Sequence, residues 1–254
     1  MNNLNSIEFI LSVVDQDYQN DLSLGELVKN KDFFLKAIQM AEKNGLYYNF
    51  IWELKNSNMD LPFMDKGRWE KEEEKLSAFK EAVGLLNTIL KSSEIDYIVI
   101  KACNMLPHVP KDIDIFVPLE EKSKAIKALE NEGFKCLRSD DIETILTKGE
   151  NIKIDVYTRL NYFGIECIDE QFLLNSVTKD KIFGVEYQGL NKEANFLLMT
   201  VHSLFGHGAM TLLDFLHLKL LMKNGVDLNA CREYAHEKGW GYACLLYTSP
   251  SPRD

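Results

Sequence analysis

Hydrophobic residues recur at helical spacing over the first ninety or so residues. Asn30 precedes the segment KDFFLKAIQMAEKNG, in which Phe34 and Ile38 fall on one helical face and Gly45 supplies a stop signal. Residues 69–91 contain apolar positions at alternating steps of three and four. These positions are Leu76, Phe79, Val83, Leu86 and Leu90. The pattern predicts an N-terminal helical module over residues 1–92, which ends in one amphipathic helix packed on the protein's own core.

The periodicity changes between residues 93 and 190. Short runs rich in β-branched and apolar residues alternate with charged or glycine-containing turns, a pattern that predicts strands. The expected strands cover residues 96–100, 113–117, 134–137, 142–147, 152–157 and 182–187, and an expected helix covers residues 119–132. This part of the chain is therefore predicted to be a sheet that carries at least one helix.

Helical patterning returns from residue 191. Asn191 can cap a segment whose apolar residues repeat at helical spacing, and a Gly-His-Gly sequence breaks that segment. Thr211, with Asp214 three residues later, is typical of a capping box that begins a further helix. The order of elements is helices, sheet, helices. It predicts an α+β protein with a C-terminal helical module over residues 191–243.

The segment 244–254 differs from the rest of the chain in composition and periodicity. It reads CLLYTSPSPRD, which resembles a transposase sequencing adapter translated in one frame. Segments of this kind are excluded from fold arguments. We expect the natural sequence to be interrupted near Ala243, with its own C-terminus missing. A genuine tail rich in serine and proline is the alternative.

The composition is that of a soluble globular protein. Of the 254 residues, 46% are hydrophobic and 27% are charged, which suffices for one large core or two small ones. There is no apolar run long enough to span a membrane and no secretory signal pattern, so we expect a cytoplasmic protein. The net charge of −10 argues against extensive nucleic-acid binding. The cysteines show no paired short spacing, which favours reduced thiols in the interior over a zinc site or disulfides.

Three aspartates on predicted strands are candidate ligands for a divalent metal ion. Asp112 and Asp114 occur in KDIDIFVP, and Asp155 occurs in IKIDVY. Successive side chains of a strand point to opposite faces, so Asp112 and Asp114 share one face, about 6–7 Å apart. Their repulsion is about 2–3 kcal/mol at an effective dielectric constant near 20, and a bound cation would offset it. Magnesium is suitable, because it binds a few carboxylates together with substrate phosphates.

Together these segments resemble the nucleotidyltransferase superfamily of the polymerase-beta type. The likeness rests on IVIKACNMLPHVPKDIDIFVP, on Asp155 in a later strand, and on the helical stretch NKEANFLLMTVHSLFGHGAMTLLDFLHL. More narrowly, the chain resembles an uncharacterised nucleotidyltransferase family that has a Lys-Gly pair, a proline, an Asp-Ile-Asp motif and a third aspartate. The resemblance covers most of the chain up to residue 243.

The resemblance implies a small mixed sheet, residues 93–190, that acts as a catalytic palm with helices around it. It implies magnesium-dependent transfer of a nucleoside monophosphate from an NTP, such as ATP, to a hydroxyl group of a small molecule, protein or RNA. Two Mg²⁺ ions would be held by Asp112, Asp114 and Asp155, and would activate the hydroxyl and steady the pyrophosphate. Asp155 would lower the barrier to deprotonation of the acceptor.

The loop after the first predicted strand departs from the family pattern. Lys101 and Ala102 occupy the Lys-Gly positions, and alanine adds a methyl group where the backbone has to approach the triphosphate. Lys101 and Lys111 could each bring a positive charge to the phosphates, or extend into solvent. Asn104 and His108 are loop residues that could line the nucleotide pocket.

Two alternative functions remain open from the sequence. The departure at Ala102 is compatible with a degenerate palm that binds a nucleotide or a partner protein without catalysis. The same carboxylates would also serve a metal-dependent nuclease, which needs no NTP.

Other polar residues near the motifs have structural explanations. His202 and His207 are five residues apart and should not share a helical face, which argues against a zinc pair and favours a packed His202. Arg159 suits either a substrate phosphate or a surface ion pair.

Overall fold

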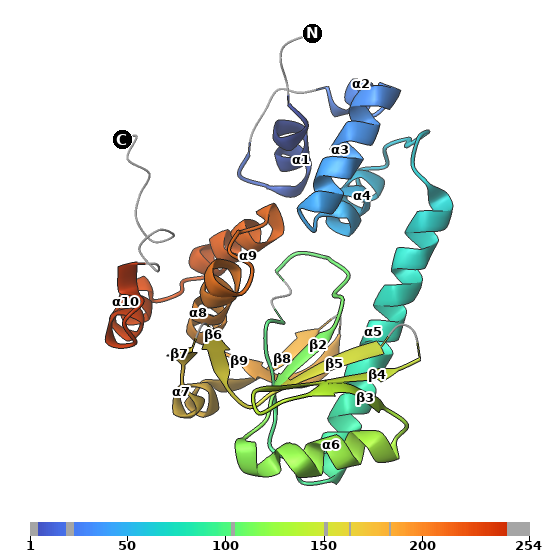
Figure 1. Ribbon diagram of the computed structural model, residues 1–254. Helices are drawn as coiled ribbons and strands as arrows, with labels where there is room; N and C mark the ends of the chain where they lie inside the picture. Colours follow the sequence, from blue (N-terminus) through green and yellow to red (C-terminus); the bar gives the residue numbers. More distant parts are fainter. Residues whose placement is uncertain are drawn as a thin grey trace.

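A five-stranded sheet lies in the lower half of the molecule as viewed in Figure 1, below the N-terminal helices. The structure is a computed structural model that describes residues 5–18, 23–102, 105–149, 152–162, 164–182 and 184–242. In spatial order, the strands are β1 (Ile98–Val99), β2 (Ile113–Phe116), β5 (Ile152–Tyr157), β4 (Glu143–Lys148) and β3 (Lys135–Ser139). β2 and β5 run parallel, and the other neighbours are antiparallel. The sheet is mixed, and the predicted α+β class is confirmed.

Two helices cover one face of this sheet. They are α5 (Lys66–Ser92) and α6 (Lys122–Asn131), which follows a single 3₁₀ turn, Leu119–Glu121. Every second residue of β2 and β5 points to this face, as the two-residue period of a strand requires. The shared core includes Leu86 and Leu90 of α5, Leu129 of α6, and Ile113, Ile115, Ile154 and Val156 of the strands. These buried positions anchor both central strands.

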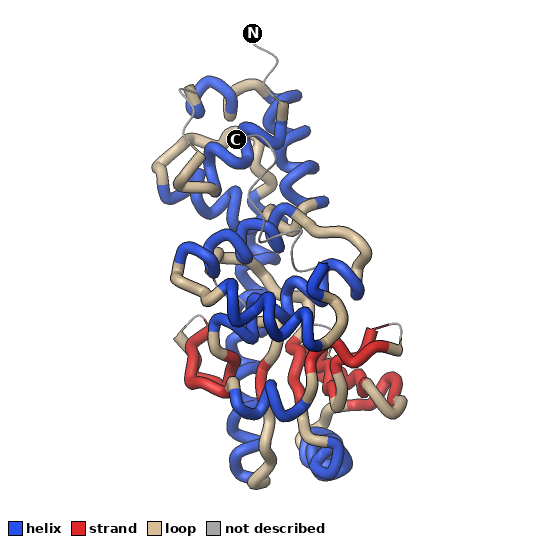
Figure 2. The backbone as a smooth tube through the Cα atoms, turned by 90° about the vertical axis from the view of Figure 1, so that its left-hand side faces the viewer, coloured by secondary structure: helices blue, strands red, loops and turns tan. Residues whose placement is uncertain are grey.

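The C-terminal part packs against the opposite face near β1 and β2. It comprises the hairpin β6 (Leu160–Tyr162) and β7 (Ile165–Ile168), with the helices α7 (Glu170–Asn175), α8 (Lys192–Val201), α9 (Leu212–Lys223) and α10 (Leu228–Glu237). Ile98 and Phe116 of the sheet share a core with Phe196 and Leu197 of α8. Figure 2 shows helices on both sides of the strands. The sheet is therefore enclosed on both faces, although unequally.

The N-terminal helices form a third hydrophobic core. They are α1 (Ser6–Val14), α2 (Leu24–Leu27), α3 (Lys31–Lys43) and α4 (Tyr47–Asn56), and they pack on the first turns of α5. Leu106, from the loop before β2, and Leu216, from α9, belong to the same core. Lys219 of α9 also pairs with Asp15 at 2.7 Å. The N-terminal helices are thus tied to the C-terminal helices and to the segment that leads into Asp112.

Helix boundaries follow the capping signals of the sequence. The side chain of Asn30 accepts a hydrogen bond from the backbone N–H of Phe33 at the start of α3. Thr211 and Asp214 form the predicted capping box of α9. α5 extends three residues before the expected start at residue 69, because Asp65 caps it and accepts from the N–H of Arg68.

A hairpin replaces the single strand that the pattern predicts at residues 182–187. Its strands are β8 (Val177–Ile182) and β9 (Val185–Leu190). Gly184, with a φ of 88°, lies inside the predicted strand and reverses the chain there. β6, β7 and α7 are also absent from the sequence-based expectation, whereas α10 lies within the helical module predicted over residues 191–243. β6, β7 and α7 are only three to six residues long, so their periodicity is weak.

Cys136 lies on the surface, contrary to the expectation of buried thiols. It belongs to β3, an edge strand whose five residues are all exposed. Cys167 and Cys231 are buried.

Several sequence-based expectations concern residues outside the described ranges. They are the expectations for Asn104, for Cys103, which is one of the cysteines expected in the interior, and for the whole segment 243–254. Among the helices that the structure describes, none combines the length and the apolar character needed to cross a membrane.

Replacing Ile154 by alanine should show how strongly the core under the sheet holds β5. Ile154 is fully buried, so Ile154→Ala should lower the free energy of unfolding by about 2–5 kcal/mol through lost burial and a residual cavity. Leu137→Ala on β3 is the control, because the Leu137 side chain is 66% exposed. This substitution should change the free energy of unfolding by no more than about 0.5 kcal/mol. Urea denaturation followed by circular dichroism measures both. Equal losses would contradict the described core.

Candidate active site

β2 and β5 bring the three predicted aspartates onto one face of the sheet. In the parallel register of these strands, Asp114 lies directly beside Asp155. Asp112 immediately precedes β2, and the two-residue period points it to the same side as Asp114. Ile113, between them, turns into the core on the other face. The carboxylates therefore form a row on the face that α5 and α6 leave uncovered.

Two lysines partly neutralise this row. Lys153 donates hydrogen bonds to Oδ2 of Asp155 at 2.7 Å and to Oδ2 of Asp112 at 3.1 Å. Lys101, in the loop after β1, donates to Oδ1 of Asp114 at 2.8 Å. Three carboxylates and two ammonium groups leave one negative charge without compensation within this set. The row therefore still favours an additional cation.

Burial opposes the charged form of two of the aspartates. Desolvation raises the pKa of Asp114 to about 6, while the nearby Lys101 acts in the opposite direction. Asp155 is only 5% exposed, and burial raises its pKa against the effect of Lys153. The Oδ1 atom of Asp155 is buried and has no hydrogen-bond partner. Such an atom is costly unless a cation or a substrate donor satisfies it.

The loop after β1 bends at Lys101. This residue has a φ of 56°, in the left-handed region that non-glycine residues rarely adopt. Ala102 is not among the described residues with positive φ, so its methyl group does not strain the backbone. Its carbonyl accepts a hydrogen bond from the Tyr187 hydroxyl at 3.2 Å, and its side chain packs on the core. The alanine at the expected glycine position is thus accommodated.

A small cavity of about 30 Å³ lies against the first two aspartates. Its polar lining comes from Asp112, Asp114, Lys101 and His108. A water molecule needs about 10–15 Å³ of such volume and several polar partners. The cavity is therefore large and polar enough for one ion or one water molecule.

The buried His217 and the half-buried His108 contact each other in front of β2. The ring of His108 packs edge-on against His217 of α9, with centroids 5.2 Å apart. The Nδ1 atom of His108 lies 3.1 Å from the carbonyl oxygen of Leu106. Burial lowers the pKa of His108 and lowers the pKa of His217 to about 3, so His217 is neutral at pH 7. This contact holds His108, four residues before Asp112, against α9.

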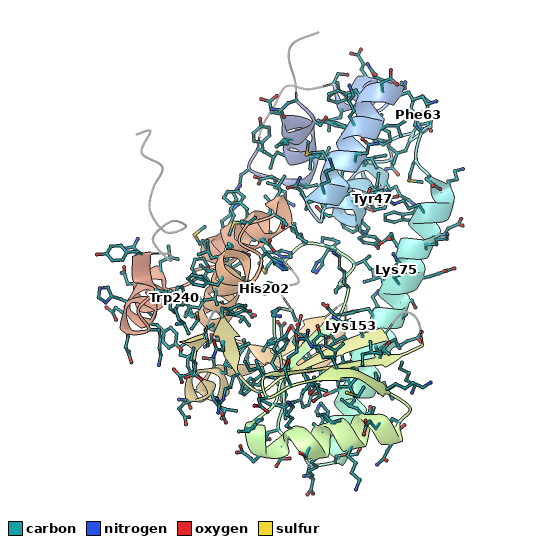
Figure 3. The ribbon with its side chains drawn as sticks, in the orientation of Figure 1. Tyr47, Phe63, Lys75, Lys153, His202 and Trp240 are labelled. Atoms are coloured by element: carbon teal, nitrogen blue, oxygen red, sulfur yellow. The ribbon has the colours of Figure 1, made fainter. Side chains whose placement is uncertain are left out.

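Two larger pockets flank the row along β5. A pocket of about 390 Å³ lies beside the N-terminal helices and includes Lys153. A pocket of about 560 Å³ lies at the other end of the strand and includes Tyr157. Four residues of extended strand separate these side chains by about 13 Å, with Asp155 midway. In the view of Figure 3, Lys153 lies above the sheet, between His202 and Lys75.

Each pocket combines cationic and aromatic side chains. The lining of the first pocket includes Tyr47, Tyr48, Arg68, Lys75 and Lys111. The lining of the second includes Lys101, Arg138, Arg159, Tyr162 and His202. Acidic residues lie among them: Glu42 and Glu72 pair with Arg68 and Lys75 in the first pocket, and Asp140 and Glu143 pair with Arg138 in the second. Each pocket therefore offers aromatic rings and charges of both signs to a ligand.

His202 and His207 lie closer together than the sequence spacing predicts. The segment His202–Gly206 is a π-helical turn, and the N–H of His207 donates to the carbonyl of His202 at 3.1 Å. This i→i+5 bond brings the two rings to a centroid distance of 4.4 Å. The expectation of separate faces is wrong for this reason. Burial lowers the pKa of His202 to about 3, and its Nδ1 lies 3.3 Å from the Tyr162 hydroxyl.

The sequence motif does not single out several residues that the structure brings to the site. Lys153 and Tyr157 each lie two positions from Asp155, so strand alternation was the available signal for them. Tyr157 accepts a hydrogen bond from Lys101 at 3.2 Å. Arg68 and Lys75 come from α5, and no local pattern connects them with the aspartates.

The carboxylates of the row could hold a cation, but their geometry is not that of a completed metal site. Within the described residues, no group of three or more His, Cys, Asp or Glu side chains is arranged to hold a metal ion. The Lys153 ammonium is shared by Asp112 and Asp155 instead. The donor set nevertheless fits, because it offers carboxylate oxygens, an unpartnered Oδ1 on Asp155 and a polar cavity beside Asp112.

The mixed sheet and its row of acidic side chains are features of a nucleotidyltransferase. Residues 108–249, more than half of the chain, match the family described as "Uncharacterised nucleotidyltransferase", and the chain belongs to this family. The family resemblance read from the motifs is thereby confirmed. The matched segment contains Asp112, Asp114 and Asp155. It also includes residues 244–249, and the adapter origin of residues 244–254 stays a prediction.

Two solved structures are similar to this chain. One is the lincomycin-bound lincosamide antibiotic adenylyltransferase LnuA, at 18% identity and a TM-score of 0.42, covering 56% of this chain and 95% of that chain. The other is an antigenic nucleotidyltransferase-like protein from Paracoccidioides brasiliensis, at 14% identity and a TM-score of 0.46, covering 67% of this chain and 88% of that chain. No protein of curated function matches the chain.

The buried His217 should make the protein less stable in mild acid. Its pKa is about 3 in the folded protein and about 6.5 when unfolded, so the unfolded state binds the extra proton between these values. From pH 7.5 to pH 5, the unfolding free energy of the parent should fall by about 2 kcal/mol more than that of His217→Gln. Urea denaturation at several pH values measures the difference. Parallel pH profiles would contradict a neutral, buried His217.

Proposed function

We propose that this protein transfers a nucleoside monophosphate from an NTP to a hydroxyl group, in a magnesium-dependent reaction. The observation that carries the proposal is the row formed by Asp112, Asp114 and Asp155, placed on one sheet face with a pocket at each end. Membership in a nucleotidyltransferase family supports the same chemistry. Beyond family membership, the proposal adds that the cation is Mg²⁺, that the donor is an NTP and that the acceptor is a hydroxyl group.

The three aspartates would hold the magnesium, and each would also contribute to the transfer reaction. Two bound Mg²⁺ ions would supply charge stabilisation at the attacking and the leaving oxygen. Asp155 is buried, with a free Oδ1, and would lower the barrier to deprotonation of the acceptor hydroxyl. Asp112 and Asp114 would orient the triphosphate through the ions. Because burial raises the pKa of Asp114, the bound cations would also keep this carboxylate ionised.

Residues around the row would bind the phosphates. Lys101 donates a hydrogen bond to Asp114 in the row, and Lys111 lines the pocket beside Asp112. Both lysines can therefore neutralise phosphate charge. Ala102 would lie next to the triphosphate, as the family resemblance implies, and Asn104, expected to do the same, lies outside the described residues.

The two flanking pockets support a reaction with two substrates. Their volumes of about 390 and 560 Å³ fall in the range of sites for small molecules. One pocket would hold the nucleoside and the other the acceptor, with the reacting groups meeting over Asp155. A net charge of −10 favours a small-molecule or protein acceptor over long RNA. Among the acceptors considered, a small molecule with a hydroxyl group agrees best with these cavities.

Pyrophosphate release from each of the four NTPs tests the reaction. The assay contains Mg²⁺, a pool of cell metabolites and RNA, and protein without residues 244–254. Release with one or more NTPs is the expected result. Omitting either the metabolites or the RNA then identifies the class of acceptor. Nucleotide binding without release would favour the non-catalytic palm, and nucleic-acid cleavage without any NTP would favour the nuclease.

Asp112→Asn should remove metal-dependent nucleotide binding without unfolding the protein. Removing one ligand from a small set should weaken Mg²⁺-dependent NTP binding by at least about 100-fold, since even the loss of a supporting contact costs 10–100-fold. Asp96→Asn is the matched control, because Asp96 is an exposed carboxylate just before β1. Calorimetric titration with an NTP in Mg²⁺ measures both. Equal binding by Asp112→Asn and the parent would contradict the metal site.

A further inference from the structure

Lys153 holds the two carboxylates that a shared metal ion would need. Its Nζ lies 2.7 Å from Oδ2 of Asp155 and 3.1 Å from Oδ2 of Asp112. These carboxylates come from different segments of the sheet, and the ammonium joins them. A magnesium ion binds oxygens at about 2.0–2.1 Å. The ammonium and a cation held by these two carboxylates would therefore compete for the space between them.

The side chain of Lys153 can also extend toward a neighbouring pocket. Its side chain is 38% exposed and also lines the pocket of about 390 Å³, together with Lys75 and Lys111. The backbone of β5 is fixed by β2 on one side and β4 on the other. The flexible four-carbon stem of a lysine nevertheless lets the ammonium swing without backbone movement. Lys153 can thus leave the carboxylates and stay at the edge of the pocket.

We propose that Lys153 is a resident counter-ion that a divalent cation displaces, and that the displaced ammonium then binds a phosphate group of the nucleotide. This inference rests on the proposed nucleotidyl transfer. In the metal-free protein, Lys153 keeps Asp112 and Asp155 together and limits their repulsion. In the protein that has bound metal and nucleotide, the Lys153 ammonium contacts a phosphate group instead.

The position of Lys153 distinguishes it from the other lysine of the row. Lys101 pairs with Asp114 and with the Tyr157 hydroxyl, near the pocket at the opposite end of β5. Lys153 alone of these two contacts a pair of carboxylates from two segments. Its removal should therefore act on metal affinity and on nucleotide affinity in opposite directions.

Lys153→Met tests the displacement, with Lys135→Met as the control. Lys135 is an exposed lysine of the edge strand β3 and lies outside the site. Without nucleotide, Lys153→Met should bind Mn²⁺ at least about tenfold more tightly than the parent, since no ammonium competes for the oxygens. Isothermal titration calorimetry measures the affinity. Lys135→Met should bind Mn²⁺ like the parent.

Thermal unfolding gives a second measurement that does not depend on catalysis. Without metal, Lys153→Met should melt about 2–4 °C below the parent, because two carboxylates lose their shared cation. Mn²⁺ should recover this loss and raise the melting temperature more in the variant than in the parent. Lys153→Gln, which retains a hydrogen-bond donor without the charge, repeats both measurements if the methionine variant does not fold.

Nucleotide affinity tests the second half of the inference. With saturating Mn²⁺, Lys153→Met should bind a non-hydrolysable NTP analogue at least about tenfold more weakly than the parent, since one phosphate contact is lost. Unchanged analogue affinity would overturn this half. Equal or weaker Mn²⁺ affinity in both Lys153 variants would overturn the displacement. If the parent and all variants fail to bind Mn²⁺ even with the analogue, the proposed metal-dependent transfer itself is contradicted.

Discussion

The parallel pairing of β2 with β5 is the constraint on which the site depends. It places Asp114 beside Asp155, and the same register places Ile113 beside Ile154 on the opposite face. A slip of one residue would turn a carboxylate into the core under α5 and α6 and an isoleucine toward the pockets. The apolar face excludes that slip, because its burial is worth far more than any single polar contact. The hydrophobic core therefore determines the geometry of the acidic row.

The charges of the acidic row destabilise the folded protein when no cation is near, and two lysines reduce this destabilisation. Burial raises the pKa values of Asp114 and Asp155, which shows that the folded protein disfavours their charges. Lys101 and Lys153 offset part of this penalty through short ion pairs. Both are flexible side chains with compact charges, so their contacts can be exchanged for others without repacking the sheet. Under the proposed function, the same two ammonium groups would be available to a charged substrate.

The sequence predicts the parts of this structure that depend on local periodicity. Residues 152–157 alternate clearly and form β5 as expected, and the caps at Asn30 and Thr211 start the helices that they predict. The parts that depend on distant pairing are not predictable in this way. Lys153 reaches Asp112 only because β5 lies beside β2. The closeness of His202 and His207 depends on a π-helical turn, which has no signal in hydrophobic spacing.

The pocket beside Asp112 depends on segments from three parts of the chain. The loop before β2 contributes Leu106 to the N-terminal core, and His108 of the same loop packs on His217 of α9. Arg68 and Lys75 of α5 form part of the opposite wall of the pocket. The family match begins at residue 108, after the N-terminal helices and α5, whereas α9 and all three aspartates lie within it. The acidic row therefore belongs to the matched segment, and the shape and charge of this pocket are determined largely by helices outside that segment.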